Sequence, residues 1–206
     1  MIEHSVRKFY QRLFVDPLAK QFIHRIAPNT ITWVSGLFGI VVIPSLFFHQ
    51  IILAVLFLLL SGYCDTLDGT LARLSQQSSD WGAVLDITMD RCVEFFVIIA
   101  LWLIHPTERA LSCFLMLGSV LLCITSFLVV GIFRQNTSEK SFYYSPGLME
   151  RAEAFIFFIV MMCWPSAFLA LAFLFSTLVT LTAIIRLKQF YQHTRKINAH
   201  SMTQPP

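Results

Sequence analysis

Four aspartates stand at helical spacing in an otherwise apolar part of the chain. Asp65 and Asp68 are three residues apart, and Asp86 and Asp90 are four residues apart. On helices, each pair would project from one side of its helix. Converging carboxylates repel one another unless cations neutralise them, and oxygen-only ligation favours hard divalent ions such as Mg²⁺ or Mn²⁺. The spacing therefore predicts a site for two divalent cations.

The residues between the two pairs suit a diphosphate beside those cations. Gly69 has no Cβ, so a bulky group can come close to the backbone next to Asp68. Ala72 keeps the same helix surface shallow, and Gly82 relieves the opposite wall. Arg73 places a bidentate cation where a phosphate that bridges the metals would need one. Phosphoryl-type transfer is the chemistry that this set of residues favours.

The elements that carry these residues must lie in a membrane. Of the 206 residues, 56% are hydrophobic and 13% are charged, against about 25% charged in ordinary globular domains. This composition excludes a soluble domain, and the charge-free stretches are long enough to hold spans of roughly 20 residues. We predict an all-α polytopic membrane protein with six transmembrane helices, near residues 31–48, 51–72, 82–104, 109–133, 148–163 and 166–187.

The breaks between the first two and the last two of these spans fall at short interruptions of the apolar runs. His49 and Gln50 form the first interruption, and Trp164 and Pro165 form the second. The third span is too short unless it begins near Gly82, which brings both aspartates of the second pair into a helix.

Lysine and arginine residues place both termini in the cytoplasm, because they gather on one side of the predicted spans. Asp65 lies about 14 residues beyond Ile51, or roughly 21 Å at 1.5 Å per residue, so the site is expected near the cytoplasmic face. We treat residues 1–206 as one domain: an amphipathic segment 1–25, a catalytic core 26–188 and a polar tail 189–206. The apolar face of the first segment consists of Val6, Phe9, Tyr10, Leu13 and Phe14. It lies either in the headgroup plane or against the protein's own spans.

Together the residues read Asp65-x2-Asp68-Gly69-x2-Ala72-Arg73-x8-Gly82-x3-Asp86-x3-Asp90, and this pattern resembles the complete signature of the CDP-alcohol phosphotransferases. The resemblance implies a membrane enzyme of phospholipid biosynthesis. Such an enzyme transfers a phosphatidyl group from CDP-diacylglycerol to a small alcohol, releases CMP and works as a homodimer. No nucleic-acid partner is expected.

The resemblance also implies roles for individual residues. The four aspartates would hold the two metals, and Asp90 would be the general base for the acceptor hydroxyl. The nucleotide and diphosphate would contact Gly69, Ala72, Arg73 and Gly82. Asn29 and Thr32 resemble the family's entry motif near the nucleotide, although helix N-capping explains either residue equally well.

The alcohol acceptor depends on cations elsewhere in the chain. Asp86 to Arg91 and residues 147–153 resemble the phosphatidylinositol-phosphate synthase branch, whose members place Lys and Arg near the end of span four. Val129 and Gly131 stand there in this chain. We therefore expect an unphosphorylated alcohol. The alternative is inositol phosphate or glycerol phosphate, with the cations supplied by Arg134, Lys140, Arg151 or Arg186; Arg134 and Arg151 are the first candidates for acceptor binding.

Other interpretations of the intramembrane charges stay open. An intramembrane prenyltransferase also uses aspartates and Mg²⁺ but needs widely separated aspartate motifs, and a small ion transporter would place carboxylates along its pathway. Arg91 is predicted to pair with Glu94 or another carboxylate.

Overall fold

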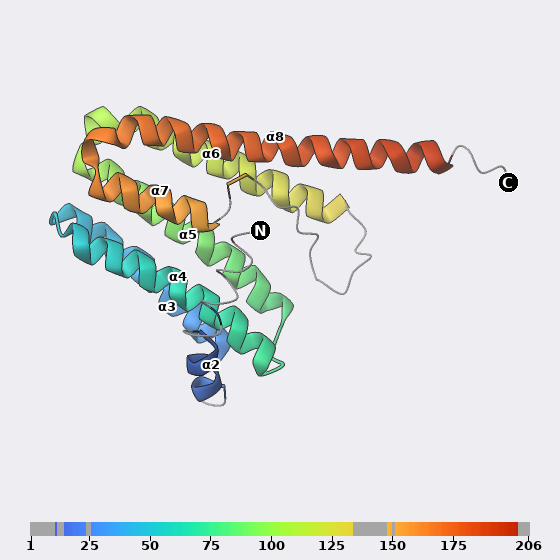
Figure 1. Cartoon of the computed structure of the whole chain (residues 1–206), viewed down its shortest axis with the longest axis horizontal. Coiled ribbons are helices and arrows are strands. Elements are labelled where there is room, and N and C mark those ends of the chain that lie inside the picture. The colour runs from blue at the N-terminus through green and yellow to red at the C-terminus, as the bar shows by residue number, and fades with distance from the viewer. Residues whose placement is uncertain (1–10, 12–14, 24–25, 134–147, 150, 202–206) are drawn as a thin grey trace. The chain divides into compact units, whose positions relative to one another are not determined.

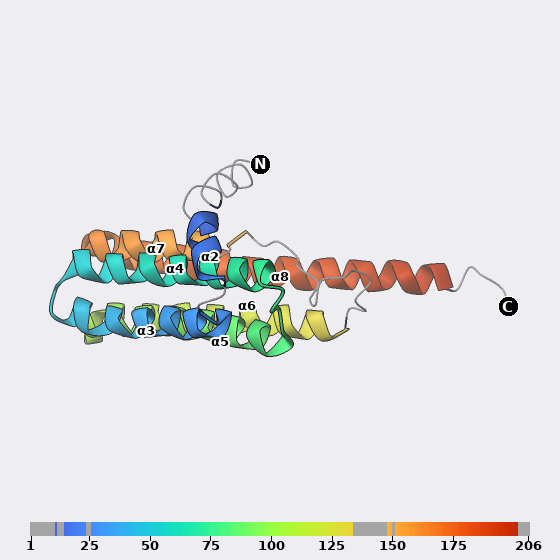
Figure 2. The same ribbon diagram turned by 90° about the horizontal axis from the view of Figure 1, so that it is seen from below.

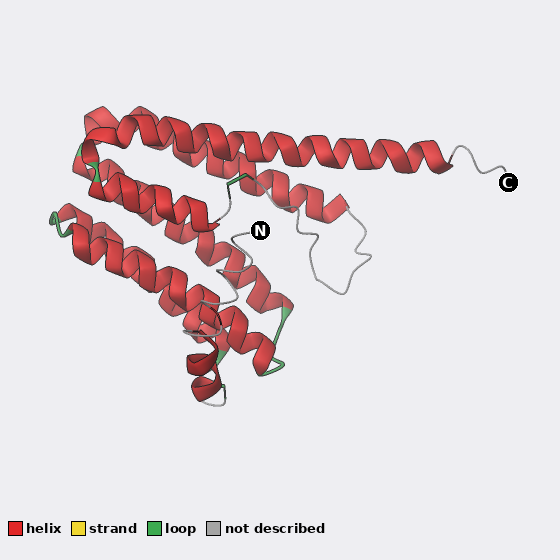
Figure 3. Cartoon of the chain, in the orientation of Figure 1, coloured by secondary structure: helices red, strands yellow, loops and turns green. Residues whose placement is uncertain are grey.

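The computed structural model describes residues 11, 15–23, 26–133, 148–149 and 151–201. In this part of the chain every element is a helix, as Figures 1 and 3 show, which confirms the all-α prediction. The helices are α2 (Asp16–Phe22), α3 (Pro28–Phe47), α4 (Ile51–Leu74), α5 (Asp80–Ile104), α6 (Pro106–Phe133), α7 (Arg151–Cys163), the 3₁₀ turn η2 (Pro165–Ala167) and α8 (Phe168–Ser201). They fall into two compact units, Met1–Ile104 and His105–Pro206.

Among the described residues, four helical segments are long and apolar enough to cross a membrane, so the chain is an integral membrane protein. They are Pro28–Phe47, Ile51–Leu74, Pro106–Phe133 and Pro165–Arg195. The predicted breaks at His49 and Trp164 are confirmed, because neither residue is helical and His49 has a positive φ of 58°. The prediction that α5 and α7 also cross the membrane remains a prediction.

The polar tail from residue 189 stays a prediction. In the structure α8 runs through the start of this tail and continues as a helix to Ser201. The reason is local, because residues 188–201 contain neither Gly nor Pro and include several good helix formers such as Lys, Gln and Arg.

In the first unit, α3 lies against both α4 and α5. A Cβ at Gly36 would lie 2.7 Å from the sulfur of Met89, and a Cβ at Gly39 would lie 2.8 Å from a methyl of Val93. These two glycines therefore permit the close approach of α3 and α5. On the α4 side, the Ser35 hydroxyl donates a hydrogen bond of 2.9 Å to the Ser61 carbonyl. Because α3 packs against both α4 and α5, it fixes the distance between the aspartates of α4 and the aspartates of α5.

The short helix α2 packs on α4, as the ribbon in Figure 2 shows. Val15 and Ala19 are fully buried in a cluster with Leu67 and Leu71 of α4. The described part of the juxtamembrane segment therefore packs on α4. The predicted apolar face formed by residues 6, 9, 10, 13 and 14 lies outside the described residues.

In the second unit, α6 packs along α8, and α7 also contacts α8. Arg109 near the start of α6 is only 4% exposed, and its guanidinium carbon lies 4.1 Å from the centre of the Phe168 ring. Thr182 of α8 accepts a hydrogen bond of 3.1 Å from the backbone N–H of Met149, just before α7 begins. The first contact joins α6 to α8, and the second joins the residues just before α7 to α8.

Candidate active site

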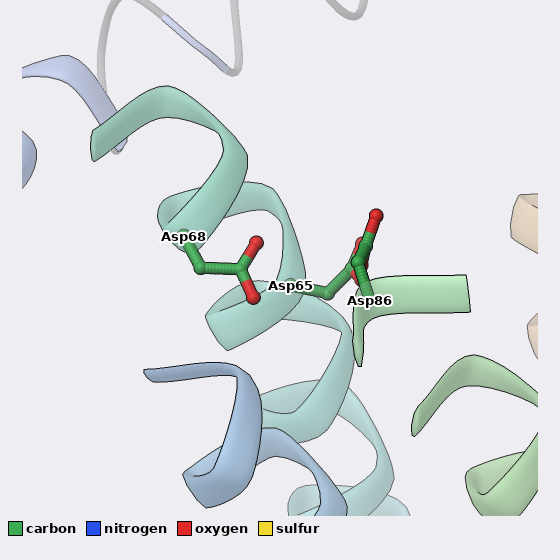
Figure 4. Close-up of side chains that lie close together, drawn as sticks. All are labelled: Asp65, Asp68 and Asp86. Carbon is green, nitrogen blue, oxygen red and sulfur yellow. The ribbon is translucent and has the colours of Figure 1, made fainter. Parts of the chain in front are cut away.

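Three of the four predicted metal ligands converge in the first unit. Asp65 and Asp68 project from α4 toward Asp86 of α5, as Figure 4 shows, and one carboxylate oxygen of each lies within 4.8 Å of the others. Asp68 is buried, whereas Asp65 and Asp86 are partly exposed. A set of carboxylate oxygens that is open on one side fits a hard divalent cation such as Mg²⁺ or Mn²⁺.

The Asp68 carboxylate is oriented by α3. The Thr32 hydroxyl, which is 4% exposed, donates a hydrogen bond of 2.5 Å to Asp68 Oδ2. The same hydroxyl lies 3.3 Å from the Pro28 carbonyl, so it is confined between the helix backbone and the carboxylate. Residues that orient a metal ligand in this way raise metal affinity. A contact between Thr32 and a nucleotide stays a prediction.

Asp90 lies one turn along α5 from Asp86 and outside the group of three that converges. Its Oδ2 atom is 4.0 Å from Arg91 Nη2, while Arg91 Nη1 is 2.7 Å from Glu94 Oε2. The predicted pairing of Arg91 with Glu94 is therefore confirmed. Sequence reasoning did not select Glu94 as a site residue, although it is only 4% exposed. The signal was present, because Asp86, Asp90 and Glu94 follow one another at intervals of four residues.

The glycines of the pattern have different surroundings. A Cβ at Gly69 would lie 3.6 Å from Arg73 Nη1, an ordinary contact, so packing within the protein does not demand glycine there. A Cβ at Gly82 would lie 3.2 Å from Asn29 Oδ1, which places Asn29 at the start of α3 beside the start of α5. Ala72 lies one turn after Asp68 on α4 and is partly buried. At Gly69 an added Cβ would therefore meet the Arg73 guanidinium at ordinary contact distance.

A comparison with known proteins identifies the family of this chain. Residues 25–189 match the family described as CDP-alcohol phosphatidyltransferase. The chain is a CDP-alcohol phosphatidyltransferase. It is thus a transferase of phospholipid biosynthesis, and the prenyltransferase and ion-transporter alternatives are excluded.

Two relatives illustrate how far the likeness extends. The phosphatidyltransferase is 30% identical over 173 residues to the inner membrane protein YnjF of Escherichia coli (strain K12), covering 81% of this chain and 84% of the relative. It is 30% identical over 156 residues to the phosphatidylinositol phosphate synthase of Corynebacterium glutamicum, covering 72% of this chain and 68% of that protein.

The fold also matches a solved structure. The crystal structure of Mycobacterium tuberculosis phosphatidylinositol phosphate synthase (PgsA1) with CDP-DAG bound aligns with a TM-score of 0.74 at 19% sequence identity. The alignment covers 86% of this chain and 94% of that one. The likeness shows that the phosphatidyltransferase has the same helical fold.

The candidate acceptor residues belong to the second unit or lie outside the described residues. Arg134 and Lys140 are outside them. Arg151 is the first residue of α7, and its guanidinium carbon lies 5.3 Å from the centre of the Phe155 ring. The structure thus places Arg151 at a helix start, as the sequence suggested, while its contact with an acceptor stays a prediction.

Arg186 of the phosphatidyltransferase is held by α6. Its Nη1 atom donates to the Cys123 carbonyl at 3.0 Å and to the Ser126 hydroxyl at 3.3 Å. Val129 and Gly131 follow on the same helix. At the positions where the phosphatidylinositol-phosphate synthase branch is expected to have Lys and Arg, α6 therefore has no cationic side chain.

Proposed function

We propose that this phosphatidyltransferase transfers the phosphatidyl group of CDP-diacylglycerol to the hydroxyl of a small polar alcohol in a reaction that depends on divalent metal ions. The observation that carries the proposal is the convergence of Asp65, Asp68 and Asp86 within 4.8 Å. Two solved structures of similar fold support it by their contents. One Mycobacterium tuberculosis PgsA1 structure has CDP-DAG bound, and another is in complex with manganese and citrate.

The four aspartates of the pattern would hold two divalent cations, Mg²⁺ or Mn²⁺. When bound, the cations neutralise the diphosphate and stabilise the negative charge that develops on the departing CMP. Arg73 binds the diphosphate, with room provided by Gly69, Ala72 and Gly82. Asn29 and Thr32 face the nucleotide from the start of α3.

Asp90 acts as the general base in this proposal. It lies on the face of α5 that also carries Asp86, and the three converging carboxylates do not include it. It takes the proton of the acceptor hydroxyl while that oxygen attacks the β-phosphorus of CDP-diacylglycerol. The bond between this phosphorus and the CMP oxygen breaks, and CMP leaves with the electron pair.

The membrane arrangement is part of the same proposal. The six helices α3 to α8 cross the bilayer, both termini are cytoplasmic, and the aspartates lie near the cytoplasmic face. Residues 1–25 are the amphipathic juxtamembrane segment, residues 26–188 form the core of a single domain, and two chains form a homodimer. The distribution of Lys and Arg supports the orientation, and the family resemblance supports the dimer.

The acceptor is proposed to be an unphosphorylated alcohol, because Val129 and Gly131 provide no cation on α6 and Arg186 is already bonded there. A phosphorylated acceptor is the second candidate, because relatives include phosphatidylinositol phosphate synthases. With a phosphorylated acceptor, Arg134 and Arg151 bind its phosphate. Other relatives are named CDP-diacylglycerol–inositol 3-phosphatidyltransferase, from rat and mouse, each 33% identical over 96 residues.

The deciding experiment measures CMP release from CDP-diacylglycerol by the purified full chain in lipid nanodiscs. The acceptors are inositol, inositol phosphate, glycerol phosphate, serine, choline and ethanolamine, each with Mg²⁺, with Mn²⁺ or with EDTA. We expect CMP only when both an acceptor and a divalent ion are present. Release that survives EDTA would overturn the metal-dependent reaction, and turnover only with a phosphorylated acceptor would overturn the preference for a free alcohol.

A further inference from the structure

Thr70 of α4 has a hydroxyl group whose hydrogen-bonding capacity is fully used. The residue is 3% exposed, and its hydroxyl donates to the Thr66 carbonyl at 2.9 Å. The same oxygen accepts a hydrogen bond of 3.1 Å from Arg73 Nη2 and one of 3.4 Å from Gln11 Nε2. A hydroxyl has one hydrogen and two acceptor lone pairs, so the donation to Thr66 turns both lone pairs toward the two nitrogen donors.

Arg73, which donates one of these hydrogen bonds, is a surface side chain at the end of α4. It is exposed on the last turn of α4, and among the described residues its recorded polar partner is Thr70. Its other terminal nitrogen, Nη1, lies 3.6 Å from the position that a Cβ of Gly69 would take. The guanidinium is therefore folded back along α4 toward Gly69, in the direction in which helical side chains lean.

We propose that Thr70 is a positioning residue, which holds the Arg73 guanidinium over Gly69 so that it meets the diphosphate of the CDP-linked lipid. The inference rests on the proposed function, because that function gives Arg73 its ligand. An exposed arginine samples many rotamers, and an anchored one loses less freedom when it binds an anion. Gln11 reaches the same hydroxyl, so the juxtamembrane segment shares this anchor.

The test compares variants that separate the hydroxyl from the bulk of the side chain. Thr70→Val keeps the shape and removes the hydrogen bonds, whereas Thr70→Ser keeps the hydroxyl. Hydrogen bonds to charged groups are worth more than neutral ones, so we expect Thr70→Val to weaken CDP binding and to raise the KM for CDP-diacylglycerol by roughly tenfold. The kcat and the KM for the alcohol change by less than about threefold, because the lost contact acts on substrate binding. Thr70→Ser restores wild-type values.

Two controls separate positioning from a general effect on the helix. Thr66→Val removes a hydroxyl that donates to the Gly62 carbonyl one turn earlier on α4, and it leaves the anchor of Arg73 in place. We expect this variant to bind CDP as the wild type does. In an Arg73→Gln background, Thr70→Val adds less than about twofold, because the group that it positions is gone.

Direct CDP binding, measured by calorimetry on the full chain with Mn²⁺, keeps this inference distinguishable from the transfer reaction. Unchanged CDP affinity in Thr70→Val, or a full tenfold effect on top of Arg73→Gln, would overturn the positioning role. If CDP binding depends on Thr70 as expected while no acceptor gives CMP release, the positioning role stands and the proposed reaction fails. A wild-type chain that binds no CDP would overturn both.

Discussion

The two units accommodate charged side chains in apolar helices in opposite ways. The first unit has an acidic face on α4 and α5, formed by Asp65, Asp68 and Asp86, and the second unit has single arginines. Arg186 is bonded to the Cys123 carbonyl and a serine hydroxyl, and Arg109 lies over the Phe168 ring. These two cations thus contact polar groups and an aromatic ring of their own unit. The aspartates instead bring like charges together, with oxygens within 4.8 Å. Such repulsion is offset by bound cations or by a proton on one of the carboxylates, and the proposed function assigns the cations to this face of the first unit.

The largest effect is expected when the proposed base is neutralised. Asp90→Asn keeps the shape and removes the proton acceptor, so CMP release should fall by about a hundred- to ten-thousandfold. Because Asp65, Asp68 and Asp86 remain, Mn²⁺ binding should persist in part. Both quantities are measured on the purified chain, CMP release by chromatography and Mn²⁺ binding by electron paramagnetic resonance.

Asp80→Asn is the matched control for that variant. Asp80 is exposed in the first turn of the same helix and is not a member of the converging group. It should retain wild-type turnover. Equal losses in the two variants would show that α5 responds to any loss of negative charge, and the distinction between the acidic face and its surroundings would then fail.

A smaller effect is expected from the hydroxyl that orients Asp68. Thr32→Val removes the hydrogen bond to Asp68 Oδ2, and loss of such a supporting contact lowers metal affinity by about ten- to a hundredfold. Thr32→Ser should keep most of the affinity. Raising the Mn²⁺ concentration should rescue turnover in Thr32→Val, and a defect that excess metal does not relieve would instead point to the nucleotide contact predicted from the sequence.

The close approach of α3 and α5 gives a test of stability rather than of chemistry. An added Cβ at Gly39 would come within 3.3 Å of the backbone of Val93, which cannot move as a flexible side chain can. Gly39→Ala should therefore lower the free energy of unfolding by about 1–3 kcal/mol, seen as a lower melting temperature in detergent. Gly118→Ala in α6 is the control, because among the described residues no atom beyond the adjoining backbone of α6 lies within 4 Å of its added Cβ. That variant should be neutral or slightly stabilising, and equal losses would contradict the role of α3.

How much the sequence could predict follows the same division between the two units. Asp65, Asp68 and Asp86 were found because fixed helical spacing determines which side chains share a face, and α4 and α5 formed where the apolar runs required. The roles of Thr32 and Thr70 were not found in this way. The bond from Thr32 to Asp68 joins residues 36 positions apart, and a threonine beside a pattern carries no signal of what its hydroxyl will contact.

In the second unit, contacts between distant residues could not be predicted for the same reason. The apolar pattern predicts the membrane-spanning part of α8 to about residue 187, and backbone propensity continues the helix to Ser201. The partners of Arg186 could not be predicted from the sequence. They depend on how α6 and α8 pack, and no fixed spacing links Arg186 to Cys123, which lies 63 positions earlier.

The smallest expected effect concerns Arg186 and sharpens the comparison between the units. If this arginine serves packing between α6 and α8, Arg186→Lys loses part of a planar set of donors and should lower the melting temperature by a few degrees. The KM values for free inositol and for inositol phosphate should then both stay within about threefold of wild type, because neither alcohol depends on a side chain that α6 already holds. Steady-state kinetics with the two acceptors side by side makes the measurement. A rise in KM confined to inositol phosphate would instead make Arg186 a ligand of the acceptor phosphate, and the cations of the second unit would then take part in the reaction.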